Sequence, residues 1–190
     1  MSKAVLISIR PKWVEKIANG EKTIEVRKTK PKLETPFKCY IYCTLPKYPH
    51  EDFIATDYPM PQFYGGGKVI GEFTCDRIYK IDKDSTDFLF KFGRLSVYKQ
   101  AAEEKCGLCV AMTDDELHGY LGHCQGYGWH ISDLRIYDTP KELSEFKTLC
   151  RVDADCCACP YYNYTKMGCD GRVIGRPPQS WCYVDDVQAK

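Results

Sequence analysis

Hydrophobic positions recur at every second residue in several short segments, a period typical of β-strands that bury one face. In residues 23–27, Ile24 and Val26 fall on one face of such a strand, and Glu25 and Arg27 fall on the other. Residues 4–9 are almost continuously apolar, as buried strands are, and residues 37–43 are rich in the aromatic and β-branched residues that strands favour. The strands that these patterns predict lie at residues 4–9, 23–27, 37–43, 68–81, 127–137 and 180–184.

Helical spacing of apolar residues is confined to two places. Pro11 suits the first turn of a helix, where its missing N–H costs nothing, and a helix over residues 11–19 follows. Thr113 stands three residues before Glu116, the spacing of a capping box, so a second helix is predicted there that ends at Gly122. Residues 140–146 are predicted to form a helical turn.

The order of these elements predicts the fold class. Short strands with few helices and without regular strand–helix–strand alternation indicate a small α+β domain built on a curled sheet or barrel. A length of 190 residues suits one domain, so residues 1–190 are interpreted as a single unit. Residues 46–67 are rich in Pro and Gly and are predicted to be a flexible surface loop, dispensable for the fold. Residues 150–172 form a Cys-rich insertion.

Composition and charge narrow the class of protein. The chain is 44% hydrophobic and 28% charged, as in ordinary globular domains. It has no apolar run of membrane-spanning length and no secretion signal, so a cytoplasmic protein with no membrane partner is expected. The net charge is only +1, yet residues 1–47 hold eleven Lys and Arg against four acids. Such a basic N-terminal quarter favours an anionic partner, with nucleic acid first, although clustered solubility charge gives the same pattern.

Lys22, Glu25 and Arg27 form the first candidate site. Two cations beside one carboxylate can bind a phosphate or a base edge, and the guanidinium suits a bidentate phosphate contact. The alternative is a solvent-facing strand with a weak surface ion pair. Strict alternation places Lys22 on the face opposite Glu25, so the three converge only if the turn after Gly20 redirects the lysine.

Aromatic and basic residues elsewhere supply a second candidate set. Nucleic-acid sites stack bases on aromatic rings and hold phosphates with cations. Arg10, Tyr127 and Trp129 are therefore candidates for the same nucleic-acid surface, with Trp13 and His130 beside them. Large aromatics are more often buried in the core, which is the competing interpretation for both tryptophans.

A third candidate site lies in the Cys-rich insertion. Thiolates at C-x-x-C spacing, with two more close by, can surround one tetrahedral zinc ion. The set consists of Cys150, Cys156, Cys159 and Cys169, with Cys157 an alternative to Cys156. The spacing predicts a structural zinc site, because no histidine or open-position carboxylate accompanies it. Free or disulfide-bonded cysteines remain the alternative.

Several blocks of the sequence resemble one known family. The G-x-K-x-x-E-x-R pattern at residues 20–27, together with blocks at 7–11, 69–73, 128–132 and 177–184, is similar to ASCH domains, and in particular to phage-associated and Firmicute-type members. The resemblance covers most of the chain apart from residues 46–67 and 150–172. It implies a PUA-like β-barrel with a cleft between barrel and helices, and it implies RNA or a nucleotide-like ligand as the partner.

Some small relatives are hydrolases of acylated cytidine or of RNA, and the resemblance then implies catalytic roles for Lys22 and Glu25. In the amidohydrolases a threonine follows the lysine by three residues, and Glu25 occupies that position here. A carboxylate does not replace a hydroxyl nucleophile without different chemistry. A water activated by the glutamate, with Glu72 as a second carboxylate, is the remaining hydrolytic route.

Overall fold

The fold of the protein is given by a computed structural model that describes residues 3–46, 53–55, 62–81, 109–122, 124–148, 162–163, 168–169 and 171–186. The helices are α1 (Pro11–Ala18), α4 (Asp114–Leu121) and the short 3-10 helix η2 (Leu143–Glu145). The strands are β1 (Lys3–Ile9), β2 (Ile24–Arg27), β3 (Phe37–Cys43), β4 (Phe53–Ala55), β5 (Gln62–Tyr64), β6 (Val69–Cys75), β7 (Ile78–Ile81), β8 (Gly126–His130), β9 (Ser132–Lys141), β10 (Lys147–Thr148), β11 (Tyr162–Asn163), β12 (Gly168–Cys169), β13 (Arg172–Val173) and β14 (Trp181–Asp185).

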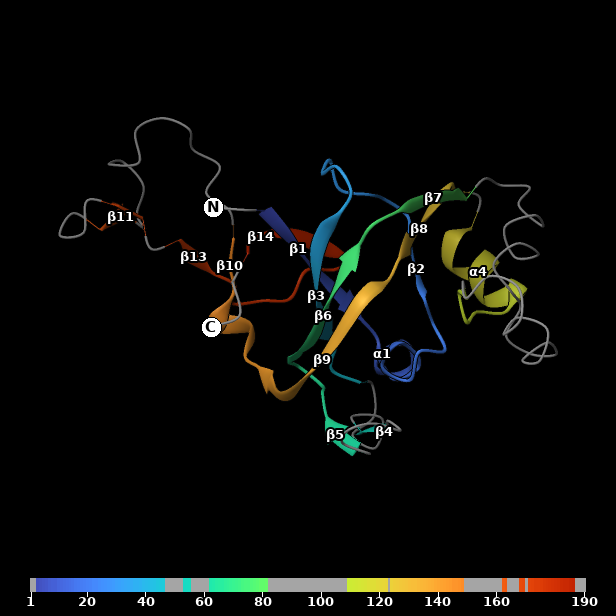
Figure 1. The fold of residues 1–190 in the computed structure, drawn as a ribbon, viewed down its shortest axis with the longest axis horizontal. Helices are drawn as coiled ribbons and strands as arrows, with labels where there is room; N and C mark the ends of the chain where they lie inside the picture. The colour runs from blue at the N-terminus through green and yellow to red at the C-terminus, as the bar shows by residue number, and fades with distance from the viewer. Residues whose placement is uncertain are drawn as a thin grey trace.

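Two sheets carry most of these strands (Figure 1). The large sheet has seven strands in the order β13-β10-β14-β1-β3-β6-β9, and the small sheet has the order β2-β8-β7. Within the large sheet β1 and β3 are parallel and the other neighbours are antiparallel. The α+β class is therefore confirmed.

The two sheets are joined by segments that bend from one sheet into the other. β6 continues into β7 after two residues, Asp76 and Arg77, and β8 continues into β9 after Ile131. Among the described residues, β2 forms no hydrogen-bonded pair with a strand of the large sheet, so the two sheets do not close into a barrel. The mixed, strand-rich architecture is as predicted, but the curled β-barrel is represented by two sheets joined at bends and not by a closed barrel.

The large sheet is buried on both faces because its central strands are apolar at nearly every position. On one face Val5 and Ile7 of β1 pack with α1 and with Trp129 of β8. On the other face Ala4 and Leu6 pack with Phe146 and its neighbours. This double burial confirms the interpretation of residues 4–9 as a buried strand, and the predicted strand at residues 37–43 is buried as well.

The small sheet is covered on its outer side by α4. Ile24 and Val26 of β2 pack against Leu117 and Leu121 of that helix. The opposite face of β2 is turned toward the large sheet, because the Arg27 guanidinium donates to the Ser8 carbonyl oxygen of β1 at 2.5 Å. β2 is therefore enclosed on both sides, and its polar face is not a solvent-exposed face.

Features that depend on neighbouring residues in the sequence agree with their predictions. Thr113 accepts from the Glu116 N–H at 3.2 Å and Glu116 accepts from the Thr113 N–H at 3.0 Å, so the predicted capping box is present. The register between β6 and β9 shifts next to Gly71, which marks an irregularity of the β-bulge kind there. A Cβ on Gly71 would lie 2.5 Å from the Arg135 carbonyl oxygen, so the close approach of β9 requires glycine.

Three predicted segments turn out differently or are only partly described. Residues 127–137 are two strands rather than one, because the chain bends at Ile131 and Asp133 has a φ of 48°. Within residues 46–67, β4 and β5 pair as an antiparallel hairpin. Within residues 150–172, β11 pairs with β12. Over the parts of the chain that the structure describes, no helix is long and apolar enough to cross a membrane.

Candidate functional site

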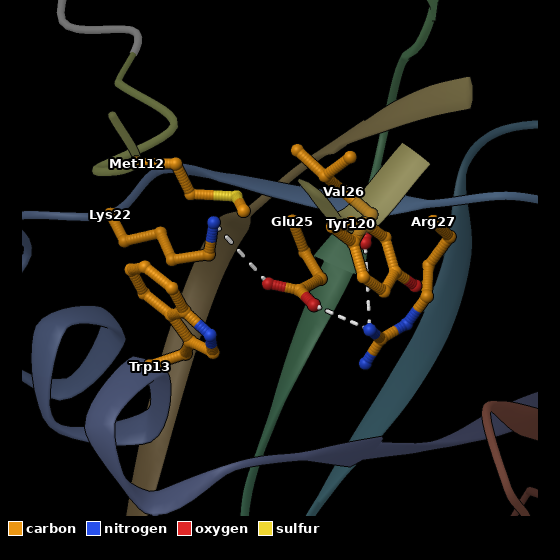
Figure 2. A pocket seen from close by; sticks show the side chains of 7 residues that line it. All are labelled: Trp13, Lys22, Glu25, Val26, Arg27, Met112 and Tyr120. Carbon is orange, nitrogen blue, oxygen red and sulfur yellow. Dashed lines mark hydrogen bonds and ion pairs between the residues drawn. The ribbon is translucent and has the colours of Figure 1, made fainter. Parts of the chain in front are cut away.

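A small pocket lies where β2 approaches the two helices. The space inside it that is open to water-sized groups is about 40 Å³, more than the room that one water molecule needs. Figure 2 shows its lining side chains converging from α1, β2, α4 and the segments before β2 and α4. They are Trp13, Lys22, Glu25, Val26, Arg27, Met112 and Tyr120.

The turn between α1 and β2 brings Lys22 to this pocket. Gly20 has a φ of +72°, a conformation that residues with a Cβ rarely adopt, and its N–H bonds to the Ile17 carbonyl oxygen. The Lys22 N–H then bonds back to the Lys16 carbonyl oxygen at 3.0 Å. The turn therefore redirects Lys22 out of the strand alternation, and its ammonium lies 3.4 Å from the Glu25 carboxylate.

Lys22, Glu25 and Arg27 form a buried ion triad. The side chains are only 1%, 4% and 9% exposed, respectively. The Lys22 ammonium faces Glu25 Oε2, and Arg27 Nη1 lies 3.0 Å from Glu25 Oε1. The Lys22 ammonium also donates to the Val110 carbonyl oxygen at 2.6 Å. The carboxylate is thus held between two cations at the bottom of the pocket.

The electrostatics of the triad are unbalanced. Burial lowers the pKa of Lys22 below its ordinary value, although the charge of Glu25 and its hydrogen bond act in the opposite direction. Two cations face one carboxylate, so the fully ionised triad carries an excess of one positive charge. Arg27 Nε is buried and has no hydrogen-bond partner among the described residues. The excess positive charge and the unpartnered Arg27 Nε both leave the pocket able to accept a polar or anionic group.

Aromatic rings and lysines surround this polar floor. Trp13 comes from α1 and Tyr120 from α4, and both rings line the pocket. The ammonium groups of Lys12 and Lys16 lie 4.6 and 5.5 Å from the centre of the Trp13 ring. Lys28 lies 5.6 Å from the centre of the Tyr120 ring. We call Lys12, Lys16 and Lys28 the lysine rim; Lys12 also pairs with Glu116.

The structure separates the other predicted nucleic-acid residues from the pocket lining. Arg10 is exposed and occupies the N-cap position of α1, where its side chain makes no capping hydrogen bond. Tyr127 lies opposite Arg27 in the β2–β8 register, under the ammonium of Lys30 at 5.7 Å. Trp129 is fully buried and packs against Phe37 with a centroid distance of 5.9 Å. Trp129 is therefore a core residue and offers no face for base stacking.

Two further candidates face elsewhere. Glu72 accepts from the Tyr137 hydroxyl at 2.6 Å, and Tyr137 packs in the cluster on the other face of the large sheet. Glu72 is thus no partner for Lys22. His130 Nδ1 lies 2.5 Å from the Asp76 carboxylate at the bend between the sheets. Partial burial acts to raise the pKa of Asp76, but the hydrogen bond and charge of His130 hold it below its usual value.

The zinc site falls mostly outside the described residues. Cys150, Cys156 and Cys159 lie there, and of Cys169 only the backbone is described, opposite Tyr162 in the β11–β12 ladder. Among the described residues, no cluster of His, Cys, Asp and Glu suits a metal ion. Burial raises the pKa of Cys182 to about 11, and this partly buried residue packs against the cluster on the far face of the large sheet.

Sequence reasoning missed two lining residues, Met112 and Tyr120. They lie about ninety residues beyond the triad in the chain and reach the pocket only because α4 packs on β2. The apolar spacing of residues 114–121 predicted the helix, but nothing in the sequence paired it with β2. A tertiary contact at this separation leaves no local signal.

Comparison with known proteins bears on the fold. The sequence matches no protein-family model and no curated protein. The ASCH protein from Zymomonas mobilis is similar in structure, with a TM-score of 0.53, 16% identity, and coverage of 96% of this chain and 88% of that one. A serine-to-alanine variant of that protein gives a TM-score of 0.54 at 16% identity, over 96% and 89% of the two chains. This likeness confirms that the chain shares the fold of ASCH proteins, although its own sheets do not close into the barrel that the resemblance implied. The phage-associated subtype stays a prediction.

Proposed function

We propose that this chain, which has the fold of ASCH proteins, binds single-stranded RNA at the pocket that the buried ion triad forms. The observation that carries the proposal is the burial of three charged side chains at the floor of an aromatic-walled pocket. Desolvating charges is costly, and an apolar floor would stabilise the fold at least as well. Buried charged groups in a concave site are therefore better explained by a ligand than by stability.

The surroundings of the pocket suit a nucleic acid in particular. Trp13 and Tyr120 supply the stacking surfaces on which unpaired bases rest, and the lysine rim supplies cations for the backbone. A pocket of about 40 Å³ admits part of one nucleotide and no duplex. RNA rather than DNA is the partner that the resemblance to ASCH domains implies.

The dependence of binding on salt tests this proposal. We expect the affinity for a mixed-sequence single-stranded RNA, measured by fluorescence anisotropy, to fall steeply with salt as phosphate contacts release counterions. Lys28→Ala should reduce the slope of log Kd against log salt by about 0.7 to 1 unit, the contribution of one phosphate contact. Lys141→Ala is the matched control, because Lys141 also lies over a ring, that of Tyr137 on the far face of the large sheet. Equal slopes in both variants would contradict the proposed surface.

A hydrolase is the second candidate, and the state of Lys22 favours it. A buried amine whose pKa is lowered, beside a carboxylate in a pocket, has the features of a group that transfers protons. Against it, Tyr120 is the only hydroxyl-bearing residue among the described residues that line the pocket, and Thr23 Oγ1 accepts from the Cys109 N–H at 2.6 Å. Product analysis on RNA and on acylated nucleosides distinguishes the candidates, because a binding protein leaves both unchanged.

We also propose that Cys150, Cys156, Cys159 and Cys169 bind one structural zinc ion. The segment around them has few aliphatic residues to offset the entropy of ordering it, and a metal supplies that free energy. Protein purified without chelator should contain about one zinc ion per chain by elemental analysis.

Cys159→Ser should lose that zinc, while the thermal unfolding of the main sheets should change little because they have their own core. Cys182→Ser is the control, since Cys182 packs against the cluster on the far face of the large sheet. Zinc-free protein, or disulfides among the four cysteines by mass spectrometry, would contradict the site.

A further inference from the structure

The polar groups on the pocket floor stand in a definite order. Figure 2 shows the Glu25 carboxylate between the Lys22 ammonium on one side and the Arg27 guanidinium on the other. The distances are 3.4 Å to Glu25 Oε2 and 3.0 Å to Glu25 Oε1, respectively. A ligand that meets this floor therefore meets a donor, an acceptor and a donor in turn.

Each member of the triad keeps hydrogen-bonding capacity for a ligand. A carboxylate oxygen accepts two hydrogen bonds, and each oxygen of Glu25 takes one of the two cations. The Lys22 ammonium has three N–H groups, and the described contacts, to the Val110 carbonyl oxygen and to Glu25, account for two of them, while Lys22 also lines the pocket. Arg27 Nε is buried without a partner among the described residues. An unmet donor of this kind is costly, which favours a ligand that brings acceptors.

The Watson–Crick edges of the four bases differ in how they meet this order. Uracil presents an acceptor (O4), a donor (N3–H) and an acceptor (O2), which complements all three groups. Cytosine turns its N3 lone pair toward the carboxylate, and adenine does the same with N1. Guanine matches Lys22 and Glu25, but its exocyclic amine is a donor that faces the Arg27 guanidinium. Mismatched polar groups in a buried site are strongly rejected.

We propose that the pocket reads the Watson–Crick edge of one unpaired uracil, with O4 accepting from Lys22, N3–H donating to Glu25 and O2 accepting from Arg27. This assignment rests on the proposed binding of RNA and names the base that the site selects. The small space admits the edge of the base, and the ring rests at the mouth against Trp13 or Tyr120. Because the floor and the uracil edge are both symmetric in their hydrogen-bonding order, either orientation of the base fits.

Homopolymers test the assignment on the unmodified protein. At fixed salt, we expect U8 RNA to bind about tenfold more tightly than C8 RNA in fluorescence anisotropy, the factor that one base-edge contact supplies. Uridine should displace labelled U8, and 3-methyluridine should be at least about tenfold weaker. The methyl group removes the N3–H and points at the carboxylate, so this comparison changes the ligand and leaves the fold intact.

A protein variant provides the reciprocal test. Glu25→Gln offers an amide N–H to the N3 of cytosine, so the preference for U8 over C8 should shrink toward equality in variant protein that circular dichroism shows to be folded. Lys141→Ala should keep the full preference.

The outcomes separate the two proposals. Equal binding of U8 and C8 with a steep salt dependence would overturn the uracil assignment and leave RNA binding standing. Displacement of U8 by inorganic phosphate but not by uridine would also overturn it, because the pocket would then hold a phosphate. Failure to bind any of the RNAs would overturn both.

Discussion

Replacing Glu25 by alanine should lower the free energy of unfolding by about 3–5 kcal/mol, the cost of leaving buried cations without their counterion. The Lys22 and Arg27 side chains are 1% and 9% exposed, so water cannot take over the role of the carboxylate. The measurement is urea unfolding followed by circular dichroism, with the midpoint compared at constant slope.

Lys68→Ala is the matched control for the loss of an ion pair. Its ammonium lies 2.9 Å from Glu142, but the two side chains are 43% and 59% exposed. An exposed pair contributes about 0–1 kcal/mol, so this variant should unfold at nearly the original urea concentration. Equal midpoints for Glu25→Ala and the original protein would show that the triad is hydrated, and the burial argument for the pocket would then fail.

The sequence predicted β2 correctly but not its environment. Alternation of Ile24 and Val26 with polar residues is typical of a strand with one solvent-exposed face. Here the polar face is turned toward the large sheet, and the charges on it satisfy each other and the Ser8 carbonyl oxygen. Periodicity reports which residues share a face, and it does not report what covers that face.

Elements with local causes were the ones that the sequence predicted best. The capping box at Thr113 and Glu116 depends only on residues close in the chain. The separation of the two sheets depends on bends at residues 76–77 and at Ile131, and on pairing between strands far apart in the sequence, such as β2 with β8. A barrel and two bent sheets bury similar residues, so the hydrophobic pattern alone could not distinguish them.

The part of the candidate site that the sequence predicted is likewise the part whose residues are close together in the chain. Lys22, Glu25 and Arg27 lie within six residues, and the glycine turn that aligns them is local. The two stacking surfaces come from helices on opposite sides of β2 in the chain. Choosing among Trp13, Trp129 and Tyr120 required the packing, since each occurs beside plausible polar neighbours in the sequence.

Replacing Trp129 by alanine should mainly lower stability, whereas replacing Trp13 by alanine should mainly weaken binding. Trp129 is fully buried against Phe37 and Trp181, so Trp129→Ala should cost about 3–5 kcal/mol of unfolding free energy by opening a cavity. Trp13 is only partly buried and lines the pocket, so Trp13→Ala should cost less stability. It should instead weaken RNA binding by about 1–3 kcal/mol, the contribution of one stacked base.

Trp129→Phe separates folding from binding, since it keeps a ring in the core and should remain folded. Its Kd for RNA should equal that of the original protein, because Trp129 does not line the pocket. Trp13→Phe should recover part of the affinity that Trp13→Ala loses, because a phenyl ring still stacks on a base. A loss of affinity in Trp129→Phe that matches the loss in Trp13→Ala, with both proteins folded, would place the RNA on β8 instead and overturn the role of the α1 and α4 rings. The comparison therefore decides which aromatic surface faces the ligand independently of how stable each variant is.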